Sequence, residues 1–229
     1  MVSALSLPRS LVQLALDAAF PGLCVGCGLE GSVLCRTCAP ALDARLDAPA
    51  GVPIGLPGDI PEPLLQLEWC APFGGVVREA LHGIKYRAEQ RLAVPLGDAL
   101  ARRWSAVGIG ADLVSHVPVH ADRARVRGYD QAELIAKVTA AQLGLRHATL
   151  LQRQRATVAQ FDLDRQHRAA NVEGAFGLAR DRRSETLHGR WILLIDDVIT
   201  TGATLAACAV ALEAGGAIGV SAITVARER

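Results

Sequence analysis

Apolar and polar residues alternate in two patterns along the second half of the chain. Residues 113–119, 191–195 and 220–225 are short, mostly apolar runs typical of buried strands. Residues 129–143 and 203–214 have helical periodicity, and glycine follows each of them. Strands that alternate with helices indicate parallel pairing through right-handed crossovers, and fully apolar strands need cover on both faces. The pattern predicts a doubly wound α/β sheet whose ligand lies beyond the carboxyl ends of the strands.

Prolines divide the chain into a small N-terminal part and a main body. Six of the eleven prolines fall between residues 40 and 63, together with three glycines. Such a density interrupts helix and strand alike. We therefore expect an N-terminal helix and metal module over residues 1–40, a connector over 41–63 and the main domain over 64–229.

Composition favours a soluble protein without general attraction to polyanions. The chain has 229 residues, 51% of them hydrophobic, and a net charge of +1. The apolar residues 11–20 contain Gln13 and Asp17, are too short to cross a bilayer and are followed by no suitable cleavage site. We expect an amphipathic helix there, no membrane span and a cytoplasmic location.

Four of the six cysteines form two closely spaced pairs. In a reducing compartment, paired C-x-x-C motifs more often hold metal than form disulfides, and four thiolates complete a tetrahedral zinc shell. Such a closed site would be structural. A redox role is the alternative, but no thioredoxin-like strand and helix surround either pair. The expected zinc ligands are Cys24, Cys27, Cys35 and Cys38.

One segment near the C-terminus combines two acids with a turn rich in hydroxyl groups. An apolar run leads into Asp196 and Asp197, and a helical pattern begins a few residues later. Backbone N–H groups at a helix start form an anion site, which a glycine allows a phosphate to approach closely. Adjacent carboxylates also need hydrogen-bond donors in front of them, which a ribose diol supplies. The residues of this predicted site are Asp196, Asp197, Val198, Ile199, Thr200, Thr201, Gly202, Ala203 and Thr204.

The segment resembles, position for position, the phosphoribosyl-pyrophosphate signature of type I phosphoribosyltransferases. The shared order is four apolar residues, two acids, two further residues, two hydroxyl residues, glycine, any residue and threonine. The resemblance implies that Asp196 and Asp197 are the catalytic acids that hold the ribose, that residues 198–204 bind its phosphate, and that magnesium accompanies the ligand. The alternative is a strand-to-helix turn in which Asp and Thr merely cap the helix. Capping explains one or two of these residues but not the whole array.

Further runs extend the resemblance over nearly the whole chain. They are VPVHADRARVRGYDQA at residues 117–132, RATVAQ at 155–160 with Arg168 and Asn171, and LHGIKY at 81–86. Together with the cysteine pairs, they are similar to ComF-type competence proteins. That family often has Phe-Asn where this chain has Tyr129-Asp130, so an amide donor is replaced by an acceptor. A ligand contact at residue 130 is therefore open.

Basic residues gather in the same region. Residues 120–170 contain nine lysines or arginines and five acids, although the whole chain is nearly neutral. Guanidinium groups bind phosphate oxygens bidentately, whereas any single arginine is as readily a solvated surface charge. Residues 152–171 are polar and poorly periodic, which is typical of a flexible hood that closes over substrate. The expected pyrophosphate or anion-binding residues are Lys85, Arg123, Arg125 and Arg127, with Lys85 resting on the family resemblance alone.

Two functions remain open on the sequence. The first is a phosphoribosyltransferase that binds phosphoribosyl pyrophosphate with magnesium and transfers phosphoribose to an acceptor that the sequence does not reveal. The second is a non-catalytic phosphoribosyl-binding module that handles single-stranded DNA during uptake, together with a competence helicase. Only four Phe, three Trp and two Tyr are present, so a platform for stacking bases is thin.

Overall fold

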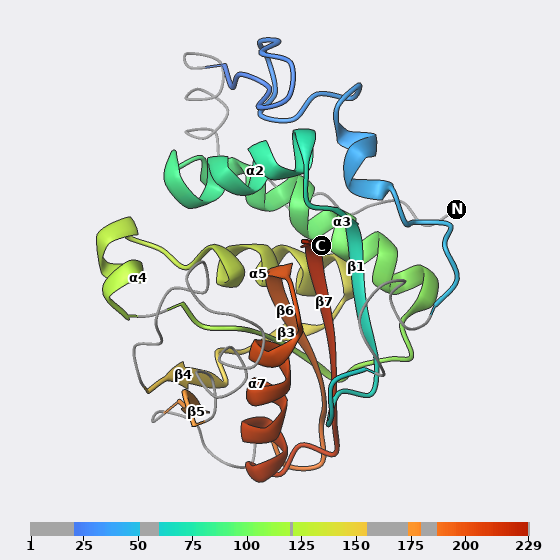
Figure 1. The fold of residues 1–229 in the computed structure, drawn as a ribbon, viewed down its shortest axis with the longest axis vertical. Helices are drawn as coiled ribbons and strands as arrows, with labels where there is room; N and C mark the ends of the chain where they lie inside the picture. Colours follow the sequence, from blue (N-terminus) through green and yellow to red (C-terminus); the bar gives the residue numbers. More distant parts are fainter. Residues whose placement is uncertain (1–20, 51–59, 120, 155–173, 180–186, 229) are drawn as a thin grey trace.

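The computed structural model describes residues 21–50, 60–119, 121–154, 174–179 and 187–228 (Figure 1). Its central sheet has five strands in the order β1-β7-β6-β2-β3, and all of them are parallel. The strands are β1 (Leu67–Pro72), β2 (Leu113–His116), β3 (Arg146–His147), β6 (Trp191–Ile199) and β7 (Gly219–Arg227). A separate antiparallel pair consists of β4 (Leu151–Arg153) and β5 (Phe176–Leu178).

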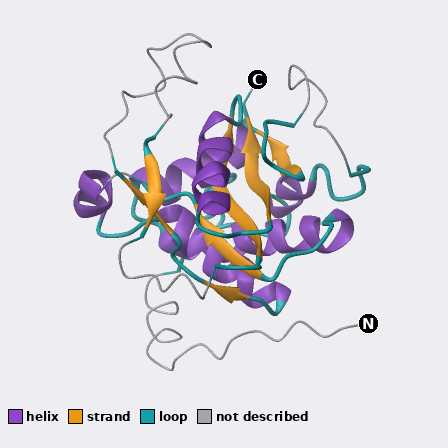
Figure 2. Ribbon diagram, turned by 90° about the horizontal axis from the view of Figure 1, so that it is seen from below, coloured by secondary structure: helices purple, strands orange, loops and turns teal. Residues whose placement is uncertain are grey.

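Helices cover both faces of the sheet, as Figure 2 shows. The helices are α2 (Gly75–Tyr86), α3 (Ala93–Val107), α4 (Ala121–Arg127), α5 (Gln131–Leu143) and α7 (Ala203–Ala214), with short 3-10 turns η1 (Ala39–Asp43) and η2 (Gln90–Leu92). Alternate residues of a strand point to opposite faces. Leu193 and Ile195 accordingly join a core with α3 and α5, whereas Ile192 and Leu194 join a second core with α7. The predicted doubly wound α/β class is confirmed.

The expected elements differ from the observed ones mainly at their ends. Helix α7 has the predicted bounds, and α5 begins two residues late because Asp130 caps its N-terminus. It stops where predicted, before Gly144 at φ 69°. Strand β2 ends three residues early, just before the Val117-Pro118 turn. Strand β6 runs four residues further than expected, through both acids to Ile199. The helix expected over residues 11–20 lies outside the described residues.

A buried ion pair fixes the segment that leads from the cysteines to the sheet. Glu68 on β1 and Arg103 on α3 have side chains 0% and 1% exposed, and Arg103 Nη2 lies 2.7 Å from Glu68 Oε2. Arg103 also donates hydrogen bonds to the carbonyl oxygens of Arg45 and Pro49, at 2.7 and 3.2 Å. The expected connector is therefore held against the sheet at residues 45–49. The division of the chain at residues 40 and 63 stays a prediction.

Helix α2 lies between the N-terminal cysteine segment and the carboxyl ends of the strands (Figure 1). Val77, Ala80, Leu81 and Ile84 of α2 belong to the same core as the N-terminal residues. Helix α2 is thus held in place by the core that it shares with the N-terminal residues. Within the described residues, no helix is long and apolar enough to cross a membrane.

Candidate functional site at the carboxyl edge of the sheet

Asp196 and Asp197 are adjacent residues of β6, close to the loop that leads to α7, and their side chains face different surroundings. Asp197 points towards α2 and α5, as its contacts with those helices show. The backbone N–H of Asp197 donates to Asp196 Oδ1 at 2.8 Å. Burial, followed by the charge of Asp197, raises the pKa of Asp196 well above its ordinary value. Asp196 therefore holds a negative charge less readily than a surface carboxylate does.

Two side chains from different helices converge on Asp197. Lys85 Nζ from the last turn of α2 lies 2.9 Å from Asp197 Oδ2, and Gln131 Nε2 from the first turn of α5 donates to the same oxygen at 3.0 Å. Burial lowers the pKa of Lys85, but the charge of Asp197, the hydrogen bond to it and the charge of Asp196 together outweigh burial and leave this pKa raised. Lys85 is therefore a cation throughout the neutral range.

A hydrogen bond to Gln131 adds Arg127 to this group of side chains. Arg127 Nη1 donates to Gln131 Oε1 at 2.8 Å, and its guanidinium carbon lies 5.2 Å from the centre of the Tyr86 ring. The LHGIKY run, the RGYDQA run and the acids of β6, far apart in the sequence, thus meet at one edge of the sheet. We call Lys85, Arg127, Gln131 and Asp197 the edge network.

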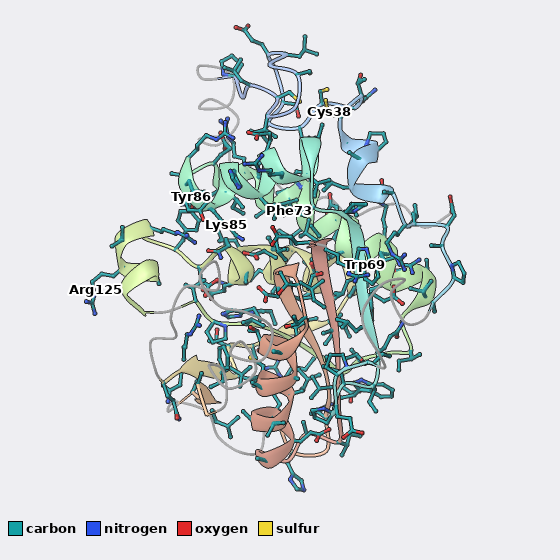
Figure 3. The ribbon with its side chains drawn as sticks, viewed as in Figure 1. Cys38, Trp69, Phe73, Lys85, Tyr86 and Arg125 are labelled. Carbon is teal, nitrogen blue, oxygen red and sulfur yellow. The ribbon has the colours of Figure 1, made fainter. Side chains whose placement is uncertain are left out.

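The alternating arginines of α4 differ in where their side chains lie. Residues two apart on a helix point to different sides. Arg125 extends outward at the far side of α4, whereas Lys85 and Tyr86 lie between α2 and the sheet (Figure 3). Of the predicted arginines, Arg127 is joined to the site, and Arg125 is exposed. The side chain of Arg123 is not among those described.

The loop after β6 contains a glycine in a backbone conformation that other residues rarely adopt. Gly202 is the N-cap of α7 at φ 82°, ψ −1°, a left-handed conformation that favours glycine. Thr201 Oγ1 accepts a long hydrogen bond from Ala203 N at 3.4 Å. A Cβ at position 202 would lie 2.8 Å from Pro61 Cγ, so the loop is closely packed on one side. The loop presents the start of α7 at the same sheet edge as the edge network.

Asp130 has a structural position, which bears on its replacement of asparagine. Its Oδ1 accepts from Ala132 N at 2.9 Å, as an N-cap of α5, and its Oδ2 accepts from Val119 N at 2.9 Å. Burial raises the pKa of Asp130, although these backbone donors lower it. Both oxygens of an aspartate can accept, whereas an asparagine has only one acceptor oxygen, so aspartate suits these two backbone donors. Asp130 thus links the loop between β2 and α4 to α5.

The four predicted zinc ligands form a compact cluster. Their Sγ atoms all lie within 4.8 Å of one another, and those of Cys27 and Cys35 are 3.6 Å apart. A tetrahedral shell with Zn–S bonds of about 2.3 Å needs sulfur separations near ~3.8 Å. Cys35 N also donates to Cys24 Sγ at 3.3 Å. Burial raises the pKa of Cys24, but backbone donors outweigh it and lower this pKa to about 6. The donor set fits a structural metal ion.

Gln131 and Tyr86 lie in the conspicuous runs at residues 117–132 and 81–86, but the sequence indicated no role for either residue. Gln131 is 5% exposed, and a buried glutamine at the start of a helix is a signal because its amide needs partners. Tyr86 is 66% exposed, and its ring lies 5.2 Å from the guanidinium carbon of Arg127, a contact that no local pattern indicates. The hood predicted over residues 152–171 begins in strand β4, which contains residues 152 and 153, and its part from residue 155 on, with Arg155, Arg168 and Asn171, lies outside the described residues.

Comparison with known proteins gives relatives but no family model that matches. The DNA utilization protein YhgH of Salmonella typhi is 28% identical over 217 residues, which cover 86% of this chain and 93% of that protein. The chain is similar to DNA utilization proteins along most of its length. The YhgH protein of Escherichia coli K12 is likewise 28% identical over 222 residues, 87% of this chain and 94% of its own. Competence protein F of Haemophilus influenzae is 34% identical over 90 residues, 39% of this chain and 38% of that protein.

Solved structures with partial similarity include two phosphoribosyl enzymes. The glutamine phosphoribosylpyrophosphate amidotransferase of B. subtilis is 22% identical with a TM-score of 0.38, over 57% of this chain and 25% of that one. The adenine phosphoribosyltransferase of Thermoanaerobacter pseudethanolicus is 16% identical with a TM-score of 0.38, over 62% and 83%.

Proposed function

We propose that this chain binds phosphoribosyl pyrophosphate, with magnesium, at the carboxyl edge of its parallel sheet. The observation that carries the proposal is the convergence of the signature loop with Lys85 and Arg127 at that edge. Lys85 pairs directly with the carboxylate of Asp197, and a second cation, Arg127, is joined to it through Gln131. A polyphosphate ester would bring the anionic oxygens that complement this surplus of positive charge.

The proposed roles divide between the acids and the loop. Asp196 and Asp197 would face the ribose diol, and the N–H groups at the start of α7 would bind its 5-phosphate beside Gly202. Magnesium usually binds one or two carboxylates together with substrate phosphates, and these two acids are oxygen donors of that kind. When bound, the ion would neutralise charge on the departing pyrophosphate.

The proposed reaction is phosphoribosyl transfer to an acceptor that is not yet identified. A lone pair of the acceptor forms a bond to C1 of the ribose, while the bond from C1 to the pyrophosphate oxygen breaks. Pyrophosphate leaves with that electron pair, and the acceptor loses its proton to solvent or to a base. Lys85 and Arg127 would stabilise the leaving group, and the two acids would stabilise positive charge on the ribose ring.

Calorimetric titration with phosphoribosyl pyrophosphate and magnesium tests the binding step. Gly202→Ala places a methyl group against Pro61 and strains a positive-φ backbone, so it should weaken binding at least tenfold. Gly189→Ala is the matched control, because Gly189 has φ 69° and open space around it. No binding by the folded wild-type chain would overturn the proposal. A screen for pyrophosphate release with bases and amines then tests transfer.

A second candidate function is binding of single-stranded DNA without catalysis, because aromatic rings gather beside the edge network. The rings of Tyr86 and His82 are 5.5 Å apart and perpendicular, and Phe73 lies 6.4 Å from His82. Exposed rings next to arginines can stack bases while the arginines contact phosphates. Relatives named DNA utilization protein and Competence protein F also support a role in DNA handling. Direct binding of oligonucleotides, measured by fluorescence anisotropy, tests this candidate.

A further inference from the structure

Gln131 contacts both a carboxylate and a guanidinium with the two ends of one amide. Its Nε2 donates to Asp197 Oδ2 at 3.0 Å, and its Oε1 accepts from Arg127 Nη1 at 2.8 Å. A carboxylate only accepts and a guanidinium only donates, so these partners determine which end of the amide is which. With 5% of its surface exposed, Gln131 exchanges few of these bonds with water.

From this bridge we infer that Gln131 is a positioning residue, which holds Arg127 as the anion-contacting arginine and keeps it from neutralising Asp197 directly. The inference rests on the proposed function, since the anion is taken to be the pyrophosphate group of the ligand. Without the bridge, an arginine next to a buried acid would form a direct bidentate pair with it. In that pair, the N–H groups of Arg127 would donate to Asp197 instead of to the ligand.

Other contacts define the geometry that the bridge imposes. Lys85 already lies against the same oxygen of Asp197, at 2.9 Å, so the acid has its own counter-ion. The Tyr86 ring lies 5.2 Å from the Arg127 guanidinium carbon and limits its movement on a second side. Asp130 fixes the first turn of α5, where Gln131 stands, by accepting two backbone hydrogen bonds there. Arg127 is thus oriented from α5 and α2, whereas Arg125 points away from the site (Figure 3).

The inference predicts an unusual pH dependence for Gln131→Glu. An ionised glutamate accepts from Arg127 but repels Asp197, whereas a protonated glutamic acid has both an acceptor and an O–H donor and restores the bridge. The affinity of Gln131→Glu for phosphoribosyl pyrophosphate should fall about tenfold relative to wild type at pH 8, which corresponds to loss of one charged hydrogen bond. The deficit should shrink as the pH is lowered towards 5.5. A residue that only supports packing would show the same deficit at both pH values.

Two further variants separate positioning from folding. Gln131→Met keeps the length of the side chain but has neither bond, so it should lose affinity about tenfold at both pH values. Gln142→Met is the control, because Gln142 is an exposed residue of the same helix that donates to Asp98 at 2.8 Å. Wild-type affinity in folded Gln131→Met, or a pH-independent deficit in Gln131→Glu, would overturn the inference.

A second readout does not depend on the ligand. When the arginines of the protein are labelled with ¹⁵N, the NMR signal of the Arg127 Nε–H group can be assigned by its loss in Arg127→Lys. This signal should shift in Gln131→Met and stay in place in Gln142→Met. If the wild-type chain binds no phosphoribosyl pyrophosphate, the proposed function fails while this signal still decides whether Gln131 holds Arg127. An unchanged signal in Gln131→Met would overturn the inference by itself.

Discussion

Lys85 and Asp197 form an ion pair that is largely removed from water. Their side chains are 19% and 10% exposed, and Nζ and Oδ2 are 2.9 Å apart. Removal of one partner from a buried pair leaves an uncompensated charge, at a cost of 3–5 kcal/mol when burial is complete. Because this pair retains some contact with solvent, we expect Lys85→Met to lower the free energy of unfolding by about 2 kcal/mol.

Urea unfolding measures this loss, and a double-mutant cycle isolates the pair. Lys85→Met combined with Asp197→Asn should recover much of the stability, since neither charge then remains unpaired. Lys137→Met is the matched control: Lys137 pairs with Glu133 at 2.9 Å, but its side chain is 54% exposed. It should change stability by less than about 0.5 kcal/mol. Equal losses at both lysines would contradict the buried-pair interpretation.

His116 gives the chain a predicted weakness in mild acid. Its Nδ1 lies 3.1 Å from His147 Nε2, and Asp130, Glu133 and Lys137 are the charged groups that face it. Burial lowers the pKa of His116 from 6.5 to about 4. The unfolded chain therefore takes up this proton first, so stability is complete above pH 6.5 and falls as the pH drops towards 4.

The size of this effect follows from the shift in pKa. Each pKa unit corresponds to about 1.4 kcal/mol, so the loss at pH 4 should be on the order of 3 kcal/mol. Chemical unfolding of wild type and His116→Asn at several pH values checks it, because contributions from other groups cancel in the difference. The variant should lose less stability than wild type between pH 6.5 and 4. Parallel curves would exclude His116 as the source.

Among the elements, α2 connects the cysteine cluster to the edge network. A Cβ on Gly26, between two cysteine ligands, would lie 3.0 Å from Val76 Cγ2, and one on Gly83 would lie 3.5 Å from Val25 Cγ1. The last turn of α2, which contains Gly83, also carries Lys85 and Tyr86. The cysteine segment thus packs directly on the helix that supplies Lys85 to the edge network.

We therefore predict that metal removal destabilises α2, the helix that carries Lys85. The purified chain should contain one zinc ion, and its removal should leave four thiols that no longer hold residues 24–38 together. Hydrogen exchange of the α2 amides should then quicken at least tenfold, while α7, on the other face of the sheet, should keep its protection. Metal analysis that finds no zinc, or equal exchange of α2 with and without metal, would contradict this prediction.

Elements whose ends carry local signals were predictable from the sequence. Helix α7 ends at Gly215 and α5 ends at Gly144, so both helices were recognised, whereas the Asp130 cap at the start of α5 was missed. Strand β1 was not, because Glu68 interrupts its apolar run and reads as a surface residue. Its burial depends on Arg103, which lies 35 residues later on α3. No local pattern reveals a partner at that distance.

The same distinction applies to the candidate site. The loop after β6 was recognisable because its residues are contiguous, and Gly202 has the left-handed backbone that the motif requires. The edge network was not, since it combines residues 85, 127, 131 and 197 from separate elements. The fold of residues 121–127 as a helix also separates Arg125 from Arg127, which the sequence analysis grouped together as anion-binding residues.

For the whole molecule, whose net charge is +1, salt dependence would distinguish a compact phosphate site from a nucleic-acid surface. Binding of single strands releases counterions, so affinity falls with a log–log salt slope near about −0.7 for each contacted phosphate. A compact pyrophosphate site bridged by magnesium should depend on salt much less steeply. Titrations of phosphoribosyl pyrophosphate and of an oligonucleotide between low and physiological salt therefore report on different surfaces.

Arg125 and Arg127 make this comparison specific. We expect Arg127→Ala to weaken phosphoribosyl-pyrophosphate binding at least tenfold, because Arg127 is oriented into the site by Gln131. Arg125→Ala should leave that affinity unchanged, because Arg125 is exposed and points away from the sheet (Figure 3). The contrary result is that substitution of Arg123, Arg125 and Arg127 by alanine leaves phosphoribosyl-pyrophosphate affinity intact but abolishes a steeply salt-dependent binding of single strands. In that case α4 belongs to a DNA-binding surface, and the arginines are not ligands of a phosphoribosyl pocket.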